Sequence, residues 1–367
     1  MRQSAADRAH AFQTAAAEEA ISRRSFLSQG LSTAAGLSAA MTGAAGLLAG
    51  LDQSFSARSV QAADKKETAV TAAPLPIVDT HQHLWDLSLF SQPWNKDNPK
   101  LTKSFVTSDY LAASKGLNVV QSVYMEVDVE EAQQTKEARY VIDLCERNDN
   151  PMVAAVISGR PASDGFAAYL DQFKGSPYIK GVRQVLHGES TPKGFCLQPG
   201  FIRGMQQLGE RGLSYDLCMR SDDLVDGYEL AKQCKQTRFI VDHCGNMDVQ
   251  EQDPAKRQRW KDGMQKLAQL DNVVCKVSGI IASAKADWKP ADLASIINDT
   301  LKTFGPDRVM FASDWPVCTL AATFSQWVNC LKELVQDRPL AEQKKLFHDN
   351  AVAFYKLPQK KWSAKTS

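Results

Sequence analysis

The sequence predicts an α/β protein built as a single (β/α)8 barrel, the TIM-barrel fold, preceded by an N-terminal export signal. From residue 76 onward, eight short runs rich in β-branched residues alternate with longer stretches of helical periodicity. Several of the short runs end in a polar residue, as strands do at the catalytic face of such a barrel. A doubly wound sheet is the alternative, but no GxGxxG motif follows any run.

The amino-terminal residues carry the export prediction. Arg23 and Arg24 precede an uncharged, weakly apolar run at 30–51, and Val60-Gln61-Ala62 places small residues where a signal peptidase reads. We expect residues 1–62 to be a twin-arginine signal peptide, which would send the mature protein to the periplasm or outside the cell. A membrane anchor is the alternative, but the run is rich in Gly, Ala, Ser and Thr, so we expect no stable insertion after cleavage.

The totals describe an ordinary globular protein. The chain has 367 residues, of which 44% are hydrophobic and 23% charged, with a formal net charge of +1. Nothing in this balance indicates nucleic acid or an anionic membrane as a partner, and the oligomeric state stays open. All eight cysteines follow the signal, and we predict no disulfides, because twin-arginine export follows folding in the reducing cytoplasm. Four of them lie in or just after predicted strands, at Cys218, Cys244, Cys275 and Cys318.

The barrel is expected at 76–357, between a polar linker at 63–75 and a C-terminal tail at 358–367. The predicted strands are Ile77–His83, Val119–Val127, Met152–Ser158, Ile179–Leu186, Leu213–Met219, Arg238–His243, Asn272–Ser278 and Arg308–Asp314. Helices are predicted near 107–115, 130–148, 164–174, 199–211, 222–235, 254–270, 290–304, 320–335 and 340–355. Polar residues at strand ends should meet at one face, and they are His83, Asp128, His187, His243, Ser278 and Asp314.

Two short motifs carry the chemistry. Because strand side chains alternate, His81 and His83 share one face and can converge on one ion or one substrate oxygen. His243 ends the sixth predicted strand and Asp314 ends the eighth, where a carboxylate can take a proton from water and return it to a leaving group. The alternatives are packing histidines in the barrel mouth and, for Asp314, a helix cap or surface ion pair.

These motifs resemble a known family. The stretch from Ile77 to Tyr355 is similar to the amidohydrolase-related superfamily of barrel hydrolases, and within it to the branch of L-fuconolactonases and L-rhamnonolactonases. The segments that carry the resemblance are Val78–Asp86, Ile179–Leu186, Asp242–Gly245, Lys276–Gly279, Met310–Val317 and Asn350-Ala351.

The resemblance implies a role for each matching residue. His81, His83, His243 and Asp314 match the family's metal or substrate site, with Asp314 and His243 as the catalytic pair. The fourth strand offers Arg183 where the wider superfamily uses a carboxylated lysine between two metals, and Lys180 lies too deep. We therefore expect one divalent ion at most, with zinc favoured, and a metal-independent site is the alternative.

Further polar residues are candidates for binding the substrate. We assign Arg183, His187, Glu126, Lys276 and Trp85 to this role from their positions at strand ends or beside the motifs. Buried ion pairs or loop packing explain the same residues as well. The predicted reaction is ring opening of a sugar lactone by water that Asp314 activates. The sequence has no GxSxG motif, which would have indicated a serine nucleophile and an acyl-enzyme. A metal-dependent decarboxylase and a non-catalytic sugar-acid binding protein are the rivals.

Overall fold

The structure is a computed structural model that describes residues 74–96 and 98–359. The predicted signal peptide, the linker up to residue 73 and the tail from residue 360 lie outside these described residues, so the predictions made for them stay predictions. Within the described part, no helix is long and apolar enough to span a membrane.

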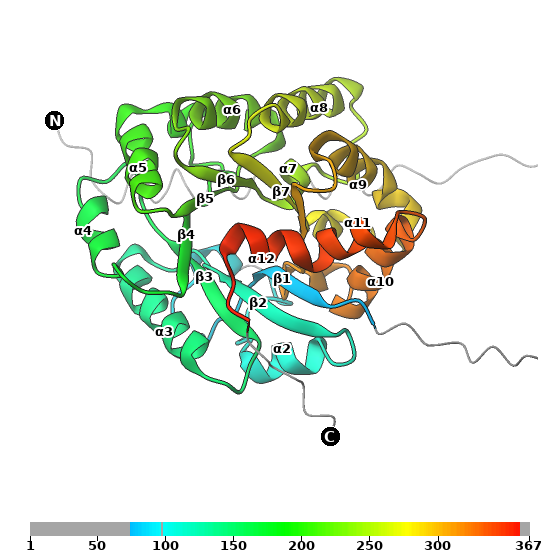
Figure 1. Ribbon diagram of the computed structural model, residues 1–367, viewed down its shortest axis with the longest axis horizontal. Helices are drawn as coiled ribbons and strands as arrows, with labels where there is room; N and C mark the ends of the chain where they lie inside the picture. Colours follow the sequence, from blue (N-terminus) through cyan, green and yellow to red (C-terminus); the bar gives the residue numbers. More distant parts are fainter. Residues whose placement is uncertain (1–73, 97, 360–367) are drawn as a thin grey trace, which may run out of the picture. The chain divides into compact units, whose positions relative to one another are not determined.

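Eight parallel strands form one sheet in the order β1 to β8, in which each strand pairs with its neighbours in the sequence (Figure 1). The strands are β1 Ile77–Gln82, β2 Val119–Met125, β3 Met152–Ser158, β4 Ile179–Arg183, β5 Ser214–Leu217, β6 Arg238–Val241, β7 Val273–Val277 and β8 Val309–Phe311. All eight predicted strands are therefore present, and the (β/α)8 fold class is confirmed.

The residues just beyond β8 bring it to β1 and nearly close the barrel. The backbone N–H of Asp314 donates to the carbonyl of His81 at 2.9 Å, and that of His83 donates to the carbonyl of Trp315 at 2.8 Å. The hydroxyl of Thr80 also donates to the carbonyl of Phe311. The junction between β1 and the segment after β8 is thus made in part by the backbone of three predicted site residues, His81, His83 and Asp314.

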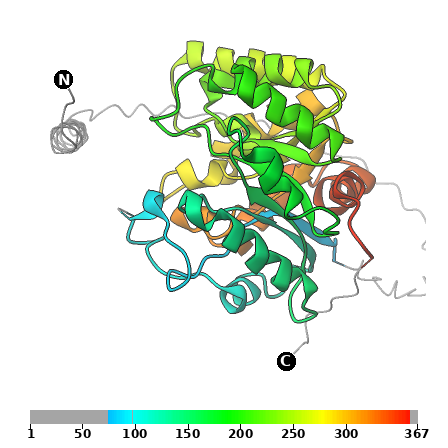
Figure 2. The same cartoon turned by 90° about the vertical axis from the view of Figure 1, so that its left-hand side faces the viewer.

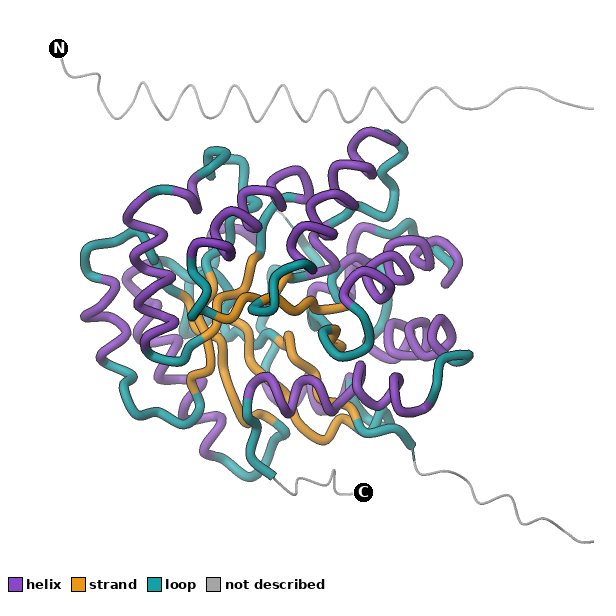
Figure 3. The backbone as a smooth tube through the Cα atoms, turned by 45° about the horizontal axis from the view of Figure 1, so that its top comes forward, coloured by secondary structure: helices purple, strands orange, loops and turns teal. Residues whose placement is uncertain are grey.

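Helices surround the strands on the outside of the barrel (Figures 2 and 3). They are α2 Thr107–Ala113, α3 Gln134–Glu146, α4 Phe166–Asp171, α5 Pro199–Glu210, α6 Leu224–Gln233, α8 Pro254–Ala268, α9 Pro290–Phe304, α10 Phe324–Val335, α11 Leu340–Lys344 and α12 Asn350–Tyr355. The short element α7 His243–Asn246 directly follows β6. A π-helical turn joins α11 to α12, so the predicted helix at 340–355 is one continuous helical run. It crosses the end of the barrel that faces the viewer in Figure 1.

Several strands end earlier than predicted, because the backbone turns where they reach the mouth of the barrel. Asp128, His243 and Asp314 all have positive φ angles, between 47° and 54°, so the chain leaves the extended conformation at or before each of them. Such backbone is costly for residues other than glycine and is concentrated at functional sites. At each of these positions the backbone therefore turns away from the direction of the strand.

The barrel interior is apolar at one end and polar at the other. The end next to the carboxyl-terminal segment is apolar, and Val78, Met125 and Ile240 pack there against Tyr355 and Leu357. The other end holds the buried polar residues described below. All eight cysteines are buried and free, as expected for small core residues.

Candidate active site

The first strand positions the two histidines of the HxH motif, and Asp79 anchors that strand. The Asp79 carboxylate accepts bonds from the Ser313 N–H at 2.8 Å, the Ser313 hydroxyl at 2.6 Å and the Tyr110 hydroxyl at 2.8 Å. These bonds tie β1 to the segment that carries Asp314. As a result, His81 and His83 are held at a fixed distance from the carboxylate of Asp314.

His83 faces Asp314 with a nitrogen that carries no proton when the imidazole is neutral. Its Nδ1 lies 3.0 Å from the carbonyl oxygen of Met125, and since a carbonyl only accepts, Nδ1 holds the proton. The bare Nε2 lies 3.3 Å from Asp314 Oδ1, and His81 Nε2 lies 3.7 Å from the same oxygen. Three acceptor atoms therefore face one another: His83 Nε2, His81 Nε2 and Asp314 Oδ1.

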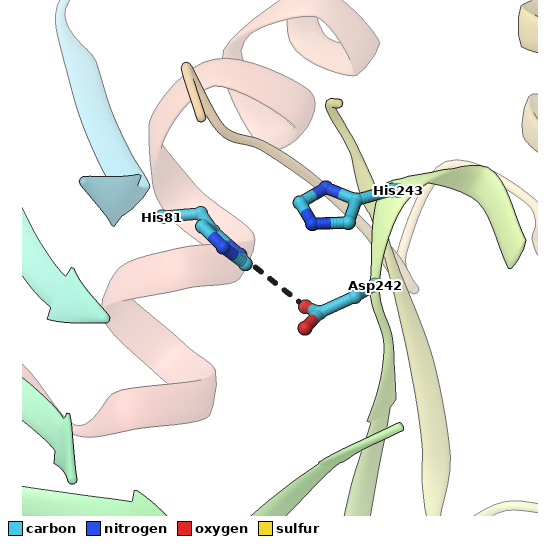
Figure 4. Close-up of side chains that lie close together, drawn as sticks. All are labelled: His81, Asp242 and His243. Atoms are coloured by element: carbon cyan, nitrogen blue, oxygen red, sulfur yellow. Dashed lines mark ion pairs between the residues drawn. The ribbon is translucent and has the colours of Figure 1, made fainter. Parts of the chain in front are cut away.

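Asp242 orients His81 and was not among the predicted site residues. Its Oδ1 lies 3.3 Å from His81 Nδ1. Figure 4 shows the two side chains facing one another. This contact places the proton on Nδ1 and leaves Nε2 to face Asp314. Burial alone would favour the neutral acid, but Lys276 and His81 beside it hold the pKa of Asp242 well below its ordinary value. Asp242 is thus a buried anion, and neither oxygen has a well-aligned hydrogen bond in the described residues.

His243 stands beside His81, on a turn of unusual backbone. Four consecutive residues from His243 to Asn246 have positive φ angles, so α7 is a left-handed turn that lifts the imidazole into the mouth. The His243 and His81 ring centroids lie 4.5 Å apart, and His243 Nδ1 lies 2.9 Å from the Ser278 hydroxyl. Burial lowers the pKa values of both imidazoles, so both are neutral near pH 7.

Gly279 leaves the space that His243 occupies. A Cβ atom at this position would lie 2.2 Å from His243 Nδ1 and 2.4 Å from its Cγ, and no real side chain makes such contacts. The φ angle of Gly279 is also positive, at 67°. The predicted motif Lys276–Gly279 therefore contributes a glycine that sets the position of a histidine from another strand.

Arg183 and Glu126 form a fixed ion pair on one side of the site. Arg183 Nε donates to Glu126 Oε1 at 2.6 Å, and Nη2 donates to the Glu126 carbonyl at 2.8 Å. Arg183 Nη1 then lies 3.2 Å from His81 Nε2 and 3.6 Å from Asp242 Oδ2. A permanent cation this close to His81 disfavours two divalent ions side by side at this position.

Two of the predicted substrate-binding residues lie away from the open mouth. Lys276 is fully buried, where its ammonium group binds Asp216 and lies 3.4 Å from Asp242 Oδ1. Trp85 is also fully buried, and its indole N–H donates to the Lys103 carbonyl at 2.6 Å. In both cases the structure favours the alternative explanation, an interior ion pair for Lys276 and loop packing for Trp85.

His187 lies at the surface of the mouth, on the loop after β4. The residue is exposed to solvent. Partial desolvation of its imidazole, together with the positive charge of Arg183, lowers the pKa of His187 to about 4. The charges of Asp242 and Asp314 also act on this imidazole, so His187 lies in the same region of the protein as the other candidate site residues.

The residues present fit one cation. Two overlapping groups have the donor atoms to hold an ion: His81, His83 and Asp314, and His81, Asp242 and His243. Lys276 and Arg183 are the cations beside the site, and between them they pair with the carboxylates of Asp216, Asp242 and Glu126. Among the ion pairs of the described residues, Asp314 has only the imidazoles of His81 and His83. A divalent cation would balance the charge of Asp314 and separate its oxygen from the imidazole nitrogens that face it.

Comparison with known proteins places the chain in a family. The model of the Amidohydrolase family matches residues 78–357, which is the whole barrel. The chain belongs to this amidohydrolase family. It is accordingly a hydrolase, and its strand-end histidines and Asp314 lie within the matched region.

Similar proteins include two that are named as sugar lactonases. The chain is 28% identical over 294 residues to L-fucono-1,5-lactonase from Burkholderia multivorans, which covers 77% of this chain and 96% of that one. It is 25% identical over 202 residues to L-rhamnono-gamma-lactonase from Scheffersomyces stipitis, covering 49% and 59% of the two chains. A crystal structure of a Burkholderia multivorans amidohydrolase with bound zinc shares the fold, with a TM-score of 0.69, 24% identity, and coverage of 77% and 100%.

Proposed function

We propose that this amidohydrolase opens the ester ring of a sugar lactone, with Asp314 as the base that activates water. The observation that carries the proposal is the position of Asp314 Oδ1, 3.3 Å from His83 Nε2 and 3.7 Å from His81 Nε2 at the carboxyl end of the barrel. Similarity to one protein named L-fucono-1,5-lactonase and another named L-rhamnono-gamma-lactonase supports the substrate class. The ring size and the sugar are set by loop side chains.

The reaction needs a base, a positive environment and a proton donor. Asp314 is 4% exposed, so its carboxylate can reach a water molecule at the mouth and remove a proton from it. The hydroxide then attacks the ester carbonyl, and the positive charge of Arg183 stabilises the oxygen anion that forms. When the ring C–O bond breaks, Asp314 returns its proton to the departing alkoxide oxygen, which becomes a hydroxyl group of the acid product.

A single divalent ion fits this site, and we assign zinc as the ion. His81, His83 and Asp314 would hold it, with His243 adjacent, and when bound it would polarise the ester carbonyl and the water. Asp242 keeps His81 in the tautomer that presents Nε2, and Ser278 holds His243. Arg183 and His187 are the proposed contacts to substrate oxygens, while Glu126, Lys276 and Trp85 support the site.

A panel of aldonolactones, followed with a pH indicator, tests the proposal. We expect acid release from at least one five- or six-membered sugar lactone, in proportion to enzyme. Release of carbon dioxide from carboxylated substrates, with no lactone opened, would instead indicate a decarboxylase. Binding of sugar acids in calorimetry with no turnover of any lactone would indicate a binding protein.

Export is proposed from the sequence alone. The twin arginine and the small residues ending at Ala62 support cleavage there and release into the periplasm or medium. N-terminal sequencing of protein from the periplasmic fraction should begin at Ala63. Full-length chain retained in the membrane fraction would instead indicate an anchor.

A further inference from the structure

A cavity opens at the amino ends of strands β4 to β6, on the face of the barrel opposite the candidate active site. Its volume is about 620 Å³, and its walls include Ile179 and Lys180 of β4, Arg238 of β6, and Tyr355 and Lys356 at the end of α12. The end of the barrel that carries α12 faces the viewer in Figure 1. Small-molecule sites occupy about 300–1,000 Å³, so this cavity has the size of a ligand site.

The lining is strongly basic. Five of its side chains are lysine or arginine and two are acidic, and one of those two, Asp171, is already bound to Arg211 at 2.9 Å. Among the ion pairs of the described residues, none gives Lys180 or Lys356 a carboxylate partner. The cavity therefore concentrates positive charge that the protein does not itself neutralise.

Arg238 is fixed in this lining without a counter-charge. Its guanidinium donates to the carbonyls of Phe354 and Gly212, and it lies over the Phe354 ring with its carbon 4.6 Å from the ring centroid. Burial, together with the neighbouring charges of Arg238 and Lys356, lowers the pKa of Lys180. Three cations, on β4, on β6 and at the end of α12, thus lie close together. Their mutual repulsion is unfavourable, and a bound anion would relieve it.

We propose that this cavity binds a small molecule with two or more negative charges, either a phosphate ester or a polycarboxylate. The shared chemistry is a compact set of anionic oxygens that the lysine ammonium groups can contact directly. Since the cavity lies at the opposite end of the barrel from Asp314, the bound molecule is not the substrate. The inference does not depend on the proposed lactonase activity.

Isothermal titration calorimetry at low ionic strength tests the proposal with two probes, sulfate and succinate. We expect one site per chain for at least one probe, and binding that weakens as sodium chloride is added. The K180Q/K356Q double variant should bind at least ten-fold more weakly. Sulfate binding would indicate a phosphate ester as the natural ligand, and succinate binding a polycarboxylate.

Lys302 offers a matched control. It lines another cavity, of about 560 Å³, where Lys261 is paired with Asp299 at 2.9 Å, and K302Q should bind the probes as the unchanged protein does. Equal affinity of K180Q/K356Q and the parent, or no binding of either probe, would overturn the proposal. If the double variant does not fold, a selenate soak of parent crystals decides, because selenate must appear in this cavity by anomalous scattering.

Discussion

Replacing Gly279 by alanine should damage catalysis through His243, which is distant from Gly279 in the sequence but lies against it in space. A Cβ at Gly279 would lie 2.2 Å from His243 Nδ1, whereas ordinary contact begins at 3.4 Å, so the imidazole must move by more than 1 Å. A displacement of about 1 Å costs roughly 100-fold in rate when it moves a site group. The bond to Ser278, worth about 1 kcal/mol, would break as well.

Gly305 provides the control for backbone strain. Its φ angle of 71° is close to the 67° of Gly279, but a Cβ there would meet nothing within 4 Å. We expect each alanine variant to lose about 1–3 kcal/mol from strain, with about 1 kcal/mol more for G279A. Urea unfolding measures these losses, and lactone turnover should fall roughly 100-fold in G279A only. Equal turnover in G279A and G305A would refute the positioning of His243 by Gly279.

Three further predictions test the surroundings of the site. Chelation should silence lactone hydrolysis and zinc should restore it at one ion per chain, whereas full activity of a metal-free preparation would show that the protein side chains suffice. K276M should lower the free energy of unfolding by about 3–5 kcal/mol, because Asp216 stays buried without its partner. The double variant D216N/K276M should recover part of that loss. A double variant no more stable than K276M would contradict this explanation. Burial and the nearby charge of Glu126 raise the pKa of Glu137 from 4.5 to about 8, so the folded state holds a proton that the unfolded state releases. The free energy of unfolding should therefore fall between about pH 4.5 and 8 in the parent and fall less in E137Q, and parallel pH profiles would disprove this.

The barrel could be predicted because its signals are local. Each strand is a short β-branched run, each helix has its own periodicity, and eight repeats of the pair leave few arrangements. The same logic placed His81, His83, His243 and Asp314 at one face, and the structure brings them together.

The interior partners could not be predicted in the same way, because they depend on how strands face one another across the barrel. Lys276 has the alternation of a site residue, but its long side chain turns to Asp216 on another strand. Asp242 adjoins His243 in the sequence and points to His81. The sequence signal for it was a charged residue directly after the apolar part of strand β6. Recognising such a residue as an orienting group requires the distance to its partner.

The position of Asp314 makes one measurement decisive, the rate of lactone opening by D314N with substrate found in the aldonolactone panel. Asparagine keeps the shape of the side chain but cannot take a proton from water, so turnover should fall by at least about 1,000-fold while the thermal transition stays close to the parent's. D349N, at a half-exposed carboxylate on the outside of the barrel, should leave turnover unchanged. Near-normal turnover by folded D314N would contradict the role of Asp314 as the base.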